Sequence, residues 1–197
     1  MLDVSTHIKS HSLFKNCGEA FFERLLHGAQ TRMYDKGYIF FFNGDKAERF
    51  YLIRSGWVKL YRETLDGSQA IIDIFTKGDI FAETAIFEND HYPYSAEAAE
   101  NCDVISLPLQ AMKKEIEENN KLALDMLSSM ARYRKQQDRE IEHRALQNAP
   151  QRIGCFILRL VDMKSSSPIT IRLPYDKTLL ASKLGMQPET FSRALNK

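Results

Sequence analysis

Between Thr31 and Pro108 the chain alternates short runs of β-branched and aromatic residues with glycine-containing turns, and this alternation limits the possible folds more than any other feature. Gly56, Gly67 and Gly78 recur every 11 residues. Glycine adopts the positive φ that tight turns need, so the spacing predicts successive hairpin turns. Regular turns between short strands favour a closed antiparallel roll or barrel over a sheet that alternates with helices. The expected strands are 38–42, 50–53, 57–61, 70–75 and 104–107.

Helical patterns flank this β-rich segment. In the first 30 residues, leucine and phenylalanine recur at the spacing of an amphipathic stripe. After Pro108, no Gly or Pro occurs between Leu109 and Ala149, which predicts one long helix or two through about Gln147. The expected organisation is therefore a β-roll with N-terminal helices over 1–109, a helical segment over 110–147 and a second small domain over 148–197.

Five positions of the segment after Pro108 step by 3, 4, 3 and 4 residues, as in the seam of a coiled coil. One interpretation is a surface helix packed on its own domain, and the other is a homodimer seam. The dimer is favoured, because an arginine and a glutamine are costly to bury in a core yet can fix the register between two copies. The seam positions are Leu127, Met130, Arg134, Gln137 and Ile141.

The last quarter of the chain is basic. Residues 148–197 carry 8 basic and 3 acidic side chains, whereas residues 1–109 carry 11 basic and 16 acidic ones, within a total net charge of +1. Such asymmetry indicates a polyanion-binding end on an acidic body. Within this quarter, Pro150 opens a predicted helix that runs to about Lys164, followed by a loop over 165–168 and a short strand over 169–173.

The last 20 residues predict two helices joined by a tight turn. Asp176 can cap a helix over 177–184, Gly185 can end it in the left-handed conformation, and Pro188 begins the next helix. On that second helix the spacing predicts an inner face of Phe191, Ala194 and Leu195. The outer face is polar throughout and holds Glu189, Ser192, Arg193 and Asn196.

That outer face has the chemistry of a major-groove reader. A guanidinium can bond guanine at two points, a carboxylate can accept from cytosine, and hydroxyls suit phosphates. The alternative is an ordinary helical hairpin with a solvated face. The preceding basic helix, the short strand, the roll and the predicted dimer helix together favour the DNA-reading interpretation.

The order of elements resembles the CRP/FNR family of bacterial transcription regulators over essentially the whole chain. Three segments carry the resemblance: 50–59 (FYLIRSGWVK), 78–83 (GDIFAE) and 187–195 (QPETFSRAL). It implies an α+β fold with a sensory antiparallel β-roll (a double-stranded β-helix like that of cyclic-nucleotide-binding domains), a dimerisation helix and a winged helix-turn-helix. It also implies duplex DNA, a second copy of the chain and RNA polymerase as partners.

Glu189, Ser192 and Arg193 match the base-reading positions of the family and are similar to the FNR type of reader. By resemblance, the operator is an FNR-like palindrome with TTGAT-type half-sites. The family continues past the point that corresponds to Lys197, with the rest of the reading helix and a β-hairpin wing. Residues 1–197 are accordingly expected to hold a truncated helix-turn-helix and to bind DNA more weakly than a longer chain.

Two effectors of the family are disfavoured by departures from its patterns. Members that bind cAMP hold the cyclic phosphate with a Gly-Glu-Leu turn and an Arg-Ser or Arg-Thr pair. The corresponding residues here are Ala82-Glu83-Thr84 and Tyr94-Ser95, so the phosphate-binding arginine is absent. Members with an iron–sulfur cluster use four cysteines, three of them near the N-terminus, where this chain has Cys17 alone.

The remaining resemblance is to the nitric-oxide-responsive, haem-using DNR-like branch, which has a similar reading segment and a histidine before Leu-Phe near the N-terminus. In this chain that histidine is His11, before Ser12-Leu13-Phe14. Haem ligation by His11 is one hypothesis, and a capping or surface role for this histidine is the other. The effector residues implied by the resemblance are Ala82, Glu83, Thr84, Tyr94 and Ser95.

Other classes of protein fit the sequence less well. A cupin-type metalloenzyme needs several histidines in its barrel, but the β-rich segment holds only His91, so no enzyme is expected. The separation of Cys17, Cys102 and Cys155 fits neither a metal knuckle nor a disulfide framework. No apolar run approaches 18 residues and no signal peptide begins the chain, which predicts a cytoplasmic protein without a membrane span. The alternative function is a dimeric sensory module that acts through protein contacts without binding DNA.

Overall fold

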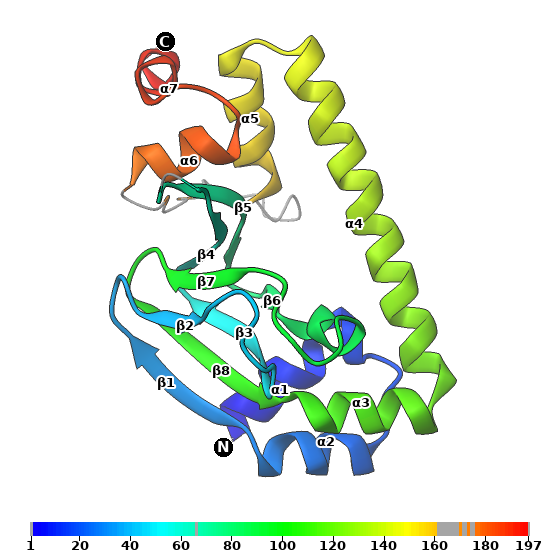
Figure 1. Cartoon of the computed structure of the whole chain (residues 1–197). Helices are drawn as coiled ribbons and strands as arrows, with labels where there is room; N and C mark the ends of the chain where they lie inside the picture. Colours follow the sequence, from blue (N-terminus) through cyan, green and yellow to red (C-terminus); the bar gives the residue numbers. More distant parts are fainter. Residues whose placement is uncertain (1, 66, 161–169, 171–172, 174–175, 197) are drawn as a thin grey trace. The chain divides into compact units, whose positions relative to one another are not determined.

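The glycine-containing segment folds into two four-stranded antiparallel sheets (Figure 1). The computed structural model describes residues 2–65, 67–160, 170, 173 and 176–196. The strands are β1 (Gln30–Tyr34), β2 (Ile39–Phe41), β3 (Arg49–Ser55), β4 (Trp57–Glu63), β5 (Gln69–Thr76), β6 (Ile80–Phe81), β7 (Ser95–Ala98) and β8 (Cys102–Pro108). One sheet has the order β1-β8-β3-β6 and the other has the order β2-β7-β4-β5. The predicted antiparallel roll and α+β class are confirmed.

The prediction of successive hairpins at the three regularly spaced glycines is wrong for two of them. Gly67 does join the paired strands β4 and β5. Gly56 and Gly78 instead carry the chain from one sheet to the other, because β3 and β6 belong to one sheet while β4 and β5 belong to its neighbour. All three keep a positive φ, between 79° and 90°. At Gly56 a Cβ would lie 2.4 Å from the Asn101 carbonyl oxygen, so glycine is required there by close approach as well.

The interior of the roll is rich in aromatic side chains. Phe81 stacks on Tyr51 with ring centroids 4.9 Å apart, and Phe41 stacks on Tyr92. The core also contains fully buried residues of three strands: Phe50 of β3, Val58 of β4, and Val104, Ile105 and Leu107 of β8. Burial of each large apolar side chain stabilises the fold by about 1.5–3 kcal/mol, so this core holds the two sheets together.

Short helices pack against the end of the roll, as Figure 1 shows for α2 beside α3. These elements are α1 (Leu2–Ser10), η1 (Ser12–Phe14), α2 (Glu19–His27), η2 (Glu83–Phe87) and α3 (Leu109–Glu118). The predicted N-terminal helices are confirmed, with Phe14, Phe21 and Leu25 in the core. The helical segment after Pro108 is two helices, because Asn119 separates α3 from α4 (Asn120–Leu146).

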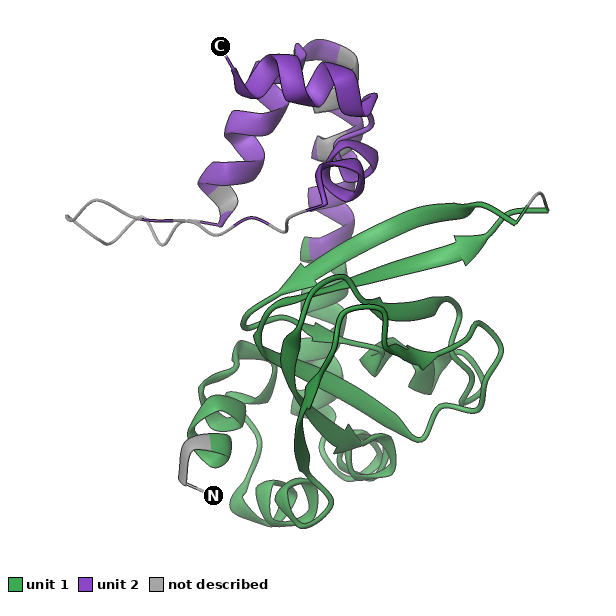
Figure 2. Cartoon of the chain, turned by 90° about the vertical axis from the view of Figure 1, so that its left-hand side faces the viewer, with its two compact units in different colours: residues 1–132 green, residues 133–197 purple. Residues whose placement is uncertain are grey.

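The chain divides into two compact units, residues 1–132 and 133–197, and the boundary falls inside α4 (Figure 2). The second unit contains α5 (Ala149–Arg159), α6 (Lys177–Lys183) and α7 (Pro188–Leu195). The loop predicted over 165–168 lies outside the described residues, as does most of the strand predicted over 169–173. Among the helices that the structure describes, none is long and apolar enough to cross a membrane.

Candidate functional site

The helix pair α6–α7 is built by local signals that the sequence contains. The Asp176 side chain accepts hydrogen bonds from the backbone N–H groups of Thr178 and Leu179, which caps the first turn of α6. After α6, Gly185 has φ 62°, and the Met186 N–H donates to the Ala181 carbonyl at 2.9 Å. This six-to-one bond through a left-handed glycine is how a helix ends before a sharp turn.

An arginine that the sequence analysis did not single out stabilises the same turn. Arg152 of α5 donates from Nη1 to the carbonyl oxygens of Leu184, at 3.0 Å, and Gly185, at 3.1 Å. These carbonyls follow a helix C-terminus and would otherwise lack an intrahelical donor. No sequence signal pairs residues about thirty positions apart, so only the tertiary structure identifies this contact.

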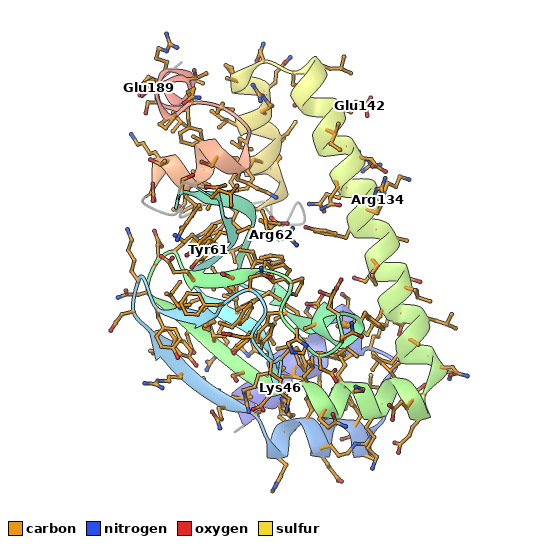
Figure 3. The ribbon with its side chains drawn as sticks, viewed as in Figure 1. Lys46, Tyr61, Arg62, Arg134, Glu142 and Glu189 are labelled. Atoms are coloured by element: carbon orange, nitrogen blue, oxygen red, sulfur yellow. The ribbon has the colours of Figure 1, made fainter. Side chains whose placement is uncertain are left out.

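The polar face predicted for the last helix is exposed on α7. Phe191 is fully buried against α5 and α6, and this fixes the rotation of the helix about its axis. Glu189 and Arg193 are exposed, and Ser192 is partly exposed; Figure 3 labels Glu189 on α7. The prediction that Leu195 faces inward is wrong: at the last residue of α7 its side chain is 41% exposed, beyond the stretch of the helix that Phe191 anchors.

The five seam positions lie on one helix, α4, and their side chains are exposed. Leu127, Met130 and Ile141 are 44–66% exposed, which is unusual for apolar side chains at regular helical spacing. Arg134 forms an ion pair with Asp138 at 3.1 Å on the helix surface; Figure 3 labels Arg134 and Glu142 on α4. By contrast, Leu122 and Met126 at the start of α4 are buried in the core of the first unit.

Four of the five expected effector residues are brought together in the roll. The Tyr94 hydroxyl hydrogen-bonds with the Thr84 side chain and with the backbone of Ala82, and the Glu83 carboxylate is close enough to act on it electrostatically. Burial and then Glu83 raise the pKa of Tyr94 to about 12. The fifth expected residue, Ser95, does not join this group, because its Oγ accepts a hydrogen bond from the Asn43 N–H at 3.0 Å.

The electrostatics of this group are unsuited to an anion. Burial raises the pKa of Glu83 to about 7, and burial also raises the pKa of Asp79, the residue before β6, to about 6. The carboxylates of Glu83 and Asp73 are the charges that act on Tyr94. Ala82 has φ 69°, a left-handed conformation that disfavours a Cβ, so its backbone is held there by its surroundings.

The raised pKa of Glu83 makes stability depend on pH. Its carboxyl binds a proton more tightly in the folded state than at its ordinary value of 4.5, so stability falls as pH rises from about 5 to 7 and stays low above that. Glu83→Gln should remove this loss and stabilise the protein at pH 8 by up to about 3 kcal/mol, with little effect at pH 4.5. Urea unfolding followed by the fluorescence of Trp57, the single tryptophan, which is buried on β4, measures the difference. Equal gains at the two pH values would contradict this account.

The haem hypothesis can be compared with the surroundings of His11. The Nδ1 atom of His11 accepts from the Leu13 N–H at 3.2 Å and caps η1, and the ring also bonds to the backbone of Gly78. Burial lowers the pKa of the imidazole. Because both sides of the ring are engaged, His11 as arranged here does not offer iron a free nitrogen. Among the described residues, no three His, Cys, Asp or Glu side chains gather in a metal-binding group.

The sequence of the chain is similar to those of bacterial regulators. Residues 31–119 match the family model of the cyclic nucleotide-binding domain. The Global nitrogen regulator of Synechococcus elongatus is 30% identical over 172 residues, which cover 84% of this chain and 77% of that protein. The Fumarate and nitrate reduction regulatory protein of Escherichia coli is 29% identical over 165 residues, 82% of this chain and 66% of that protein.

Two solved structures superpose on nearly the whole length of this chain. A protein of Ruegeria pomeroyi DSS-3, provisionally assigned as a cyclic nucleotide binding protein, superposes with a TM-score of 0.75 and is 32% identical, over 98% of this chain and 84% of its own. DNR of Pseudomonas aeruginosa superposes with a TM-score of 0.61 and is 30% identical, over 97% of this chain and 85% of its own.

Proposed function

The chain belongs to the CRP/FNR family of transcription regulators, which are not enzymes, and on that premise we propose that it is a homodimer that binds duplex DNA sequence-specifically through α7. In this proposal the β-roll senses a signal, and the sensed state decides whether the two copies of α7 fit their half-sites. RNA polymerase is the further partner that the family resemblance implies.

The observation that carries the proposal is the two-sided character of α7. Phe191 anchors one side, and the opposite side offers a carboxylate, a hydroxyl and a guanidinium within two turns. In the major groove, Arg193 would donate to guanine O6 and N7, Glu189 would accept from cytosine N4, and Ser192 would bond a base edge or a phosphate. Pro188 and Glu189 in the first turn also suit a helix whose N-terminal end enters the groove.

A homodimer follows from the operator and from α4 together. An FNR-like palindrome with TTGAT-type half-sites has twofold symmetry, and a symmetric protein presents two reading helices about 34 Å apart. The exposed apolar positions of α4 provide a surface that a second copy would cover. Arg134 and Gln137 between them would fix the register of the two helices.

The effector group is proposed to be Ala82, Glu83, Thr84 and Tyr94, without Ser95, whose hydroxyl accepts from the Asn43 N–H. The acidic surroundings of Tyr94 favour a ligand other than a cyclic nucleotide, because an anion would meet carboxylates where it needs a cation. Haem stays a candidate by resemblance to the DNR-like branch. If it binds, a residue other than His11, or a rearranged His11, must hold the iron.

A binding titration tests the proposal. The protein is titrated against a fluorescent duplex with a TTGAT inverted repeat and against a duplex of the same composition in scrambled order. We expect about a hundredfold or greater preference for the palindrome and a steep loss of affinity between 50 and 200 mM salt, because several phosphates are neutralised on binding. Equal affinity for the two duplexes would instead favour a sensory module that signals through protein contacts.

A further inference from the structure

The junction between α3 and α4 is a break that the sequence does not announce with Gly or Pro. Asn119 stands between the two helices in an extended conformation, with φ −135° and ψ 96°. Its N–H donates to the Glu115 carbonyl at 2.7 Å, and its carbonyl accepts from the Leu122 N–H at 3.1 Å. The backbone of Asn119 therefore ends one helix and begins the next.

The side chain of Asn119 forms a hydrogen bond in each direction along the chain. Its Nδ2 donates to Glu115 Oε1 at 2.8 Å, and its Oδ1 accepts from the Lys121 N–H at 3.0 Å. An amide that bonds backward to α3 and forward to α4 fixes the angle between the two helices, since either bond would be lost if the angle changed.

Glu115 connects this junction to the N-terminal helices. The glutamate is only 6% exposed, and its second oxygen, Oε2, pairs with Nη2 of Arg24 on α2 at 2.8 Å. Arg24 also approaches Glu118 at 3.4 Å. Removing one partner of a buried charged pair leaves the other charge uncompensated, so this contact is costly to break.

A second contact ties the same N-terminal region to α4. Asn16 donates from Nδ2 to Asp125 Oδ2 at 2.7 Å. Leu122, one turn before that aspartate, and Met126, directly after it, are buried in the core. The first two turns of α4 are thus held by packing in the core of the first unit and by a polar contact from Asn16.

From these contacts we propose that Arg24, Glu115 and Asn119, here named the elbow cluster, are positioning residues that set the direction in which α4 leaves the first unit. Through them the helix α2 acts on the proposed dimer seam without touching it. A helix of 27 residues is about 40 Å long, so a change of about 10° at the elbow moves its far end by about 7 Å. This inference rests on the proposed function in so far as α4 forms the dimer.

The test uses the full chain and two readouts, hydrogen exchange of α4 and dimer affinity. Glu115→Gln keeps the bond to Asn119 but loses the charged pair with Arg24, and Arg24→Gln removes the pair from its more exposed side. We expect amides 119–126 to exchange about tenfold faster or more in both variants, while β3 and β8 exchange as before. We also expect the dimer dissociation constant to rise about tenfold, and the double variant to be no worse than Glu115→Gln alone.

Glu19→Gln is the matched control, because it removes another ion pair of α2 with the same length, 2.8 Å to Lys9 on α1, that lies on the surface and does not involve α3 or α4. It should change neither readout. Unchanged exchange at 119–126 in both elbow variants would overturn the proposal, and so would faster exchange with an unaltered dimer. If the protein proves monomeric, the proposed function fails while the exchange result still decides whether the elbow cluster holds α4. Trp57 fluorescence confirms that each variant is folded.

Discussion

Replacing Arg193 by alanine should abolish discrimination between the palindromic operator and scrambled DNA. Each copy of α7 would lose a guanidinium that can bond guanine at two points, and such a pair contributes about 1–3 kcal/mol of discrimination. Because the dimer carries two copies, affinity for the operator should fall at least about thirtyfold, while binding to scrambled DNA changes little. Fluorescence anisotropy with both duplexes at one salt concentration measures both numbers.

Two matched variants separate base reading from simple charge. Arg193→Lys keeps the positive charge but cannot present the planar fork, so it should lose most of the discrimination and retain non-specific binding. Arg139→Ala removes an exposed arginine from α4, away from α7, and should leave discrimination intact. Loss of discrimination in Arg139→Ala but not in Arg193→Lys would show that charge, and not the reading face, drives binding.

Placing a glutamate at Met130 should dissociate the dimer. Burial of a side chain of this size contributes about 1.5–3 kcal/mol to the stability of an interface. In a twofold dimer each substitution is present in both copies, so its effect occurs twice. A carboxylate opposite its own copy adds repulsion and desolvation to that loss. The dimer dissociation constant should therefore rise more than about a hundredfold, and operator binding should weaken with it. Analytical ultracentrifugation over a range of concentrations gives the constant.

The control for this prediction is Leu146→Glu. Leu146 is on the same helix and, at 75% exposed, is more accessible than Met130, at 44%. In the heptad set by the seam it falls on the opposite face, so its replacement should leave the dimer intact. If both variants dissociated the protein equally, or if the wild-type protein were a monomer at micromolar concentration, α4 would not be the seam.

Much of the fold could be predicted because the responsible forces are local. Gly67 and Gly185 sit where the chain requires positive φ, Asp176 caps α6, and Pro188 begins α7, as the sequence indicates. The sequence also predicts the strongly apolar strands β3 and β4, which the structure contains. Strands β1, β6 and β7 were missed, because they are short or rich in small and polar residues and are strands only through their partners.

The candidate sites show the same division. The exposed polar face of α7 could be derived from spacing alone, since a helix places residues three and four apart on one side. The grouping of Tyr94 with Thr84 and Glu83 followed only from the family resemblance, and the hydrogen bonds that join them are visible only in three dimensions. The roles of Arg24 and Arg152 had no signal, because their partners lie far away in the sequence.

By itself the sequence determined where α6 and α7 begin, where the most apolar strands lie, which helix faces are apolar and that the C-terminal quarter is basic, because backbone conformation and periodicity depend on neighbouring residues. Only the tertiary structure decided that Gly56 and Gly78 pass between sheets, that Ser95 turns to Asn43 and that Arg24 reaches Glu115. Strand pairs and buried ion pairs join residues that lie tens of positions apart in the sequence. Bringing such residues together costs conformational entropy, and the packing of the whole core offsets that cost. No local sequence pattern therefore specifies which distant residues will pair.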